Sequence, residues 1–317
     1  MKKIFLFAAL TAAVMSSCSN DDDVIQSSNS NASLDAQKIA FVTDNAPVTR
    51  AGDVTSLTNF KVTGVTSTGT TYFANETFNF ANSMFSSSTP YYWPTSGTMD
   101  FYAANAGTIN YASGSASMTF TANNGTTDYV TAVSKAASKA VTVPLSFKHI
   151  MSRLSIKVKP YDVTDGYDYK ISKINVCAMG SGKYTFGTST GSVGTWSDVK
   201  SYVDYVYTGG LPATTGKSNS GKVISLSEAY YLIPPTAAQS DMITVDFYFE
   251  VYKNGVLVGN FTGSSSVSTD ITNIGLAPGK SVCLVLMPSF DTVGEKPIAF
   301  TATVTPWGST TDVEAEI

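Results

Sequence analysis

Hydrophobic and polar residues alternate in short runs along most of the chain. In residues 141–149 and again in 153–160, every second residue is apolar. Such alternation predicts strands that bury one face. The runs recur about every 8 to 12 residues between turn-forming residues, which indicates antiparallel β-sandwiches. The expected strands are 38–43, 57–65, 71–80, 90–93, 99–103, 115–121, 141–149, 153–160, 170–179, 183–186, 201–207, 229–233, 242–253, 256–262, 280–287 and 297–307.

The predicted fold class is therefore all-β. Only residues 128–140 contain a stretch of helix-like composition, AVSKAASKA. Asn254-Gly255 is a predicted hairpin turn, because this pair tolerates the positive φ angles of a type I′ turn. Since the chain is long enough for two domains, we place a boundary near residue 150. This gives an N-terminal β-sandwich over 38–150 and a C-terminal β-sandwich over 151–317.

The first 37 residues are expected to lie outside the fold. Residues 1–17 combine two lysines with an apolar run that is too short to span a bilayer, as in a signal peptide. Small residues before Cys18 resemble a bacterial lipoprotein cleavage site, so we expect Cys18 to carry lipid; the alternative is an ordinary signal peptide with a chance cysteine. Residues 18–37 are rich in Ser, Asn and Asp and are predicted to form a flexible tether. The lipid would be the chain's only attachment to a membrane.

Charge and cysteine content narrow the range of functions. The net charge is −4, and it becomes −6 once Lys2 and Lys3 are removed. Without a basic patch, nucleic acid is not an expected partner. Cys177 and Cys283 lie in apolar runs and are either a disulfide pair or two buried free thiols.

The motifs of catalysis and cofactor binding are missing from the sequence. A single histidine, His149, is more consistent with a structural residue at the domain joint than with a catalytic or metal site. The segment 209–218, GGLPATTGKS, is one residue too long for a phosphate-binding loop. Asp162, Asp165 and Asp168 do not have the spacing of an EF-hand calcium loop. We therefore expect neither enzymatic activity, nor a cofactor, nor a metal.

Arg50 is the strongest candidate for a processing site. It is one of only two arginines and follows the predicted strand 38–43 and a turn containing Pro47. An arginine in a linker after a separable strand suits cleavage between Arg50 and Ala51. The alternative is a surface arginine between two ordinary strands.

Three further segments carry candidate binding or modification residues. In the tail 311–317, Val313, Ala315 and Ile317 alternate with acidic residues, which predicts a strand that could be donated to another chain. The rings of Tyr91, Tyr92 and Trp93 either stack on sugars or fill a sandwich core. Asp291-Thr292-Val293 resembles the O-glycosylation motif of Bacteroidetes, with Thr292 as the acceptor.

Several motifs occur together in a recognisable order. They are the cleavage site at Cys18, Thr49-Arg50-Ala51, YYWPTSGTMDFYAANAG at 91–107, VTVPLSFKHIMSRLSIKVK at 141–159, YYLIPPT at 230–236 and a late strand ending at Trp307. The set resembles the fimbrillin-like lipoproteins, the Mfa-like type V pilus subunits of Bacteroidetes. The resemblance implies two tandem transthyretin-like sandwiches, no catalysis, an arginine-specific protease and other pilus subunits as partners. It also implies an outer-membrane or cell-surface location before assembly into a fimbrium.

Assembly by strand exchange has a physical basis in the first strand. Removal of residues 38–43 would uncover roughly three core-facing side chains, each worth about 1.5 to 3 kcal/mol when buried. The empty groove should capture a strand of another subunit, and the tail 311–317 is the best donor in this chain. As a stalk or tip subunit the chain would polymerise head to tail. The alternative function is a surface lipoprotein that binds a glycan, a protein or a host or bacterial receptor without polymerising.

Overall fold

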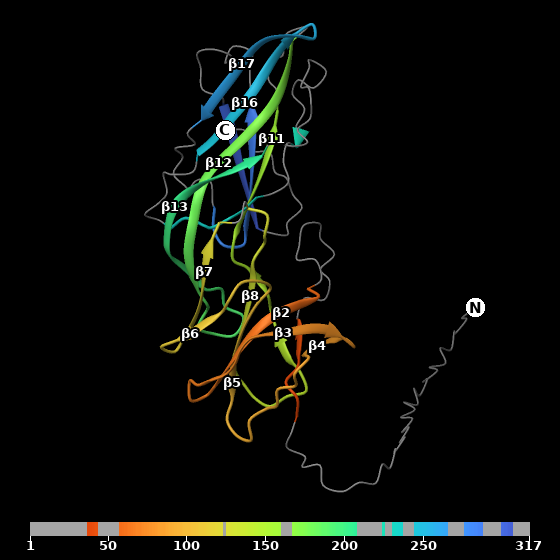
Figure 1. Cartoon of the computed structure of the whole chain (residues 1–317), viewed down its shortest axis with the longest axis vertical. Helices are drawn as coiled ribbons and strands as arrows, with labels where there is room; N and C mark the ends of the chain where they lie inside the picture. Colours follow the sequence, from red (N-terminus) through yellow and green to blue (C-terminus); the bar gives the residue numbers. More distant parts are fainter. Residues whose placement is uncertain are drawn as a thin grey trace, which may run out of the picture. The chain divides into compact units, whose positions relative to one another are not determined.

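A computed structural model describes residues 37–43, 57–122, 125–159, 167–207, 224–225, 230–236, 244–265, 276–287 and 299–306 (Figure 1). All regular elements in these ranges are strands, which confirms the predicted all-β class. Within the same ranges, no helix has the length and apolar character needed to cross a membrane.

The first sheet has eight strands in the order β10-β8-β5-β2-β3-β4-β1-β9. Its neighbouring strands are antiparallel except β1 and β9, which are parallel. The strands are β1 (Phe41–Thr43), β2 (Asn59–Thr66), β3 (Thr71–Ala81), β4 (Met84–Ser87), β5 (Met99–Ala104), β8 (Val130–Ala137), β9 (Val143–Leu145) and β10 (Lys148–His149).

The second sheet has six strands in the order β17-β16-β12-β7-β6, and β13 also pairs with β12. The long strand β12 passes β16 along its first part and β7 along its last residues (Figure 1). The strands are β6 (Asn110–Ala112), β7 (Ser115–Thr121), β12 (Tyr167–Thr185), β13 (Thr195–Tyr207), β16 (Thr244–Lys253) and β17 (Val256–Ser265).

The third sheet has five strands, with the order β14-β11-β18-β19 and β15 pairing with β11. Strands β11 and β18 run parallel, whereas the other pairs are antiparallel. The strands are β11 (Ser152–Val158), β14 (Ile224–Ser225), β15 (Tyr230–Leu232), β18 (Lys280–Met287) and β19 (Ala299–Pro306).

Two hydrophobic clusters lie on opposite faces of the eight-stranded sheet. The first cluster belongs to this sheet and its loops, and it contains Ile39, Phe41, Phe60, Phe78, Phe85, Trp93, Phe101 and Ala132, among others. The second cluster combines residues of the same sheet, such as Tyr102 and Val133, with Met118, Tyr184 and Phe186 of the six-stranded sheet. The central strands β5 and β8 are therefore buried on both faces.

The strand pairing does not follow the predicted boundary at residue 150. Strands β6 and β7 precede that residue in sequence but pair within the sheet that contains β12. The described residues from 37 onward also belong to one compact unit. The division into two tandem domains therefore stays a prediction.

Two predicted elements differ from the structure. The helix-like stretch AVSKAASKA contributes to β8. Residues Val130–Ser134 are buried, with Val130 and Ala132 in the first cluster and Val133 in the second, and such packing outweighs a short helical propensity. The expected strand 90–93 is reduced to one bridge between Lys38 and Tyr92. Pro90 and Pro94 lie on either side of Tyr92, and proline limits strand pairing because it has no backbone N–H to donate.

The predicted hairpin after β16 is confirmed. Asn254 and Gly255 have φ angles of 48° and 80°, as a type I′ turn requires.

Candidate functional site: the first strand and its groove

Strand β1 is inserted between two other strands of the eight-stranded sheet. Phe41 is paired with Phe85 of β4 on one side and with Val143 of β9 on the other. The amide of Val143 donates a hydrogen bond of 2.9 Å to the carbonyl of Ala40. The strand is shorter than predicted, since regular pairing begins at Phe41 and only the bridge at Lys38 precedes it.

The residues before β1 are bound to a second segment. The amide of Ile39 donates to the carbonyl of Tyr91 at 2.8 Å, and the amide of Trp93 donates to the carbonyl of Gln37 at 2.9 Å. Residues 37–43 are therefore held by three stretches of chain: residues 91–93, β4 and β9.

The side chains of this segment reach into the first cluster. Ile39 and Phe41 belong to this cluster and are 2% and 0% exposed, and Ala40 between them is 7% exposed. The ring of Phe41 makes edge contacts with Phe78 at 4.8 Å, Phe101 at 5.1 Å and Phe60 at 6.2 Å between centroids. We call the space bounded by Phe60, Phe78, Phe85 and Phe101 the Phe41 pocket.

The aromatic segment Tyr91–Trp93 is mostly part of the same core. Trp93 is 4% exposed, its Nε1 donates to the carbonyl of Ala140 at 3.1 Å, and its ring meets the ring of Phe101 edge-on at 5.7 Å. Tyr91 is half-buried against Phe73, with a centroid distance of 4.6 Å.

The burial of two of these rings favours the core alternative over an exposed sugar platform. Side chains alternate along the segment, so Tyr91 and Trp93 point inward while Tyr92, at 37% exposure, points outward. The hydroxyl of Tyr91 donates to Glu76 at 3.1 Å, and desolvation together with this carboxylate raises the pKa of Tyr91.

His149 occupies a structural position. It lies in β10, paired with Val130 of β8, and its Nδ1 is 2.8 Å from a carboxylate oxygen of Asp128. Among the described residues, no group of three or more His, Cys, Asp or Glu side chains could hold a metal ion.

The two cysteines are free thiols on different sheets, so the disulfide alternative is not realised. Cys177 lies in β12 and Cys283 in β18. Burial, followed by the charge and hydrogen bond of Asp204, raises the pKa of the Cys177 thiol. A raised pKa disfavours the reactive thiolate, which is consistent with a packing role.

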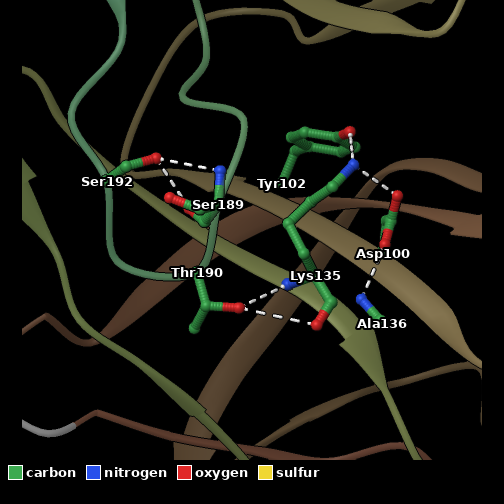
Figure 2. A network of polar contacts seen from close by, with 7 residues as sticks. All are labelled: Asp100, Tyr102, Lys135, Ala136, Ser189, Thr190 and Ser192. Atoms are coloured by element: carbon green, nitrogen blue, oxygen red, sulfur yellow. Dashed lines mark hydrogen bonds and ion pairs between the residues drawn. The ribbon is translucent and has the colours of Figure 1, made fainter.

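A polar network that the sequence did not predict joins the first two sheets (Figure 2). The ammonium of Lys135 in β8 contacts the carboxylate of Asp100 in β5 and lies 2.7 Å from the hydroxyl of Tyr102. Thr190, in the loop after β12, accepts a hydrogen bond from the amide of Lys135 at 2.8 Å. The amide of Gly191 donates to the carbonyl of Val133 at 2.9 Å.

This network fastens the loop after β12 to the face of β8. Burial lowers the pKa of Lys135, but hydrogen bonds to Asp100 and Tyr102 outweigh it and raise the pKa overall. Lys135 thus stays charged at neutral pH, and its ammonium joins β8 to Asp100 and Tyr102 of β5 rather than acting as a base. In the sequence, Lys135 lies among small and apolar residues, and this pattern does not identify the residues that it contacts.

Several sequence-predicted residues lie outside the described residues. They are Cys18, Arg50, Ala51, Thr292, the tail residues Val313, Ala315 and Ile317, the segment 209–218, and Asp162 and Asp165. Their proposed roles therefore stay predictions.

Comparisons with known proteins place these features in a wider context. A family model described as fimbrillin-like matches residues 42–307. A fimbrial protein from Bacteroides vulgatus has 16% identity and a TM-score of 0.62, covering 85% of this chain and 99% of its own. A protein from Bacteroides uniformis assigned to cell adhesion has 15% identity and a TM-score of 0.51, covering 86% of this chain and 99% of its own. At these identities the likeness concerns the fold, and no curated protein sequence matches the chain.

Proposed function

Because the chain belongs to the fimbrillin-like family, we propose that it is a type V pilus subunit, in the stalk or at the tip, that assembles by strand exchange. Family membership supports a pilus-subunit role and a cell-surface location, and it suggests a structural protein rather than an enzyme. Strand exchange is the finer part of the proposal, and the burial of β1 is the observation that carries it.

The proposed route to the surface begins with lipidation. Residues 1–17 act as the signal peptide, Cys18 receives the lipid, and residues 18–37 connect the lipid to the fold. The precursor is then held at the outer membrane by its lipid alone, because one anchor bearing several acyl chains suffices for stable attachment.

The proposed trigger is cleavage between Arg50 and Ala51 by an arginine-specific protease. This cut separates residues 37–43 from β2, leaving β1 held by non-covalent contacts alone. Loss of β1 exposes the apolar pockets that Ile39 and Phe41 fill. Burial of each of these side chains stabilises the fold by about 1.5 to 3 kcal/mol. Loss of β1 also leaves β4 and β9 without their shared neighbour, so both present unpaired backbone groups.

A strand from another subunit then fills the groove. Within this chain the donor is the tail 311–317, with Val313, Ala315 and Ile317 on its apolar face. At about 3.4 Å per residue this tail reaches roughly 24 Å, which is enough for one strand. Head-to-tail donation does not close on itself, and it therefore builds a filament.

Deletion of residues 311–317 tests the donor role. The deleted chain, cut after Arg50, is expected to accept a strand but not to donate one, so it should cap filaments of the intact chain. A matched variant with Asp312, Glu314 and Glu316 changed to Gln keeps the apolar face and should still donate. Size-exclusion chromatography with light scattering measures the outcome, and polymers of undiminished length from the deleted chain would refute the donor role.

A further inference from the structure

We propose that the groove beneath β1 selects a donor strand that carries a large aromatic residue two positions after an aliphatic one. This inference rests on the proposed strand exchange and identifies the chemistry of the incoming strand. The chain's own tail, which lacks the aromatic residue, fits this groove less well. The tail still donates to another copy, as proposed above, but a subunit whose donor strand carries the aromatic residue is the preferred partner.

The shape of the Phe41 pocket carries this inference. Four phenylalanine rings bound the pocket, and Phe41 meets three of them edge-on with interplanar angles of 66° to 84°. An aliphatic side chain cannot reproduce these contacts in full, because the attraction between two rings depends on the quadrupoles of both. The pocket is also fully closed to solvent, with Phe41 at 0% exposure.

The pairing of β1 gives the direction and register that we assign to the donor. Strand β1 runs parallel to β9 and antiparallel to β4, and the proposed donor takes the same direction. Side chains of a strand alternate between faces, so an occupant of the Phe41 pocket places the residue two positions earlier at the site of Ile39. Ile39 is 2% exposed, and its site accepts an aliphatic side chain.

The tail of the chain lacks the aromatic residue. The apolar residues that alternate along the tail sequence are Val313, Ala315 and Ile317, so a donor register that uses this apolar set would place Val, Ala or Ile in the Phe41 pocket. Each choice loses three ring contacts and leaves unfilled volume, because packed interiors relax only partly around a smaller side chain. Each contact between two aromatic rings changes the affinity by roughly two- to tenfold. Because three such contacts are lost together, we expect the tail to bind about 100-fold more weakly than a strand with Phe.

Peptide exchange tests this selectivity without relying on the natural cut. Thr49–Gly52 is replaced by the recognition sequence of an unrelated protease, and the purified chain is cut there. Fluorescent peptides are then offered: residues 37–43 unchanged, the same peptide with Phe41→Ile, and the tail 311–317. A Val42→Ala peptide is the matched control, because Val42 faces away from the pocket and is only half-buried. Fluorescence anisotropy gives the affinity of each peptide.

We expect the affinities of the peptides to depend on whether they carry the aromatic residue. The unchanged and Val42→Ala peptides should bind within about threefold of each other, and the Phe41→Ile and tail peptides at least tenfold more weakly. Equal binding of all four peptides would overturn the selectivity while leaving strand exchange intact. A cut chain that keeps its own strand against a large excess of every peptide would overturn strand exchange and, with it, this inference.

Discussion

Replacement of Phe41 by Ala is expected to destabilise the first cluster severely. The side chain is fully buried and contacts the rings of Phe60, Phe78 and Phe101. Truncation of a buried Phe to Ala costs about 3 to 5 kcal/mol, through lost burial and the cavity left behind. A loss of this size is a large part of a typical stability of about 5 to 15 kcal/mol.

Urea unfolding followed by tryptophan fluorescence measures this cost. Trp93 is buried in the same cluster and meets Phe101 edge-on, so its emission reports on the surroundings of β1. With a urea dependence of about 2 to 3 kcal/mol per molar, the midpoint should fall by roughly 1 to 2.5 M. Val141→Ala is the control, because Val141 is 73% exposed and should change stability by less than about 0.5 kcal/mol. A loss below about 1 kcal/mol for Phe41→Ala would refute the view that β1 completes this core.

Three further changes test other parts of the structure. Lys135→Met should cost about 1 to 2 kcal/mol in urea unfolding, because Asp100 loses its charged partner; an unchanged midpoint would contradict the cross-link. Burial raises the pKa of Tyr205 to about 12, so the folded chain keeps a proton that the unfolded chain loses above about pH 10. Stability should therefore fall between about pH 10 and 12, and Tyr205→Phe should flatten this part of the pH profile. Gly194→Ala should cost about 2 kcal/mol by thermal unfolding, since a Cβ there would collide with the carbonyl oxygen of Thr185.

Alternation of apolar residues predicted many strands well, because it reports directly on burial of one face. The expected strands 115–121 and 280–287 coincide with β7 and β18. The turn at Asn254-Gly255 was equally clear, since few residue pairs adopt positive φ angles at low cost.

The pattern was less informative where a strand is buried on both faces or distorted. Strand β8 carries five consecutive buried residues, so it lacks the alternation that distinguishes a strand from a short helix. Strand β12 was expected as two strands, 170–179 and 183–186, because two glycines interrupt its pattern. The structure keeps it continuous through an irregularity between Ser181 and Lys183.

The candidate site was predictable in its local part only. The sequence predicted a strand over 38–43 with roughly three core-facing side chains. It could not identify the Phe41 pocket, whose walls come from β2, β3, β4 and β5, because long-range pairing leaves no local pattern. For the same reason it left open whether Trp93 stacks on a sugar or fills the core, and it missed Lys135.

Digestion of the purified mature chain with an arginine-specific protease tests the central claim most directly. Arg50 and Arg153 are the only arginines, and Arg153 is half-buried in β11 between two paired strands, so a single cut after Arg50 is expected. Mass spectrometry locates the cut, native sizing follows assembly, and an Arg50→Gln chain is the control. The account predicts release of the segment that contains residues 37–43 and ends at Arg50, and the appearance of oligomers in the presence of a donor subunit. A resistant Arg50, or a clean cut that leaves a stable monomer retaining β1, would contradict it and favour a surface lipoprotein that binds its ligand without polymerising.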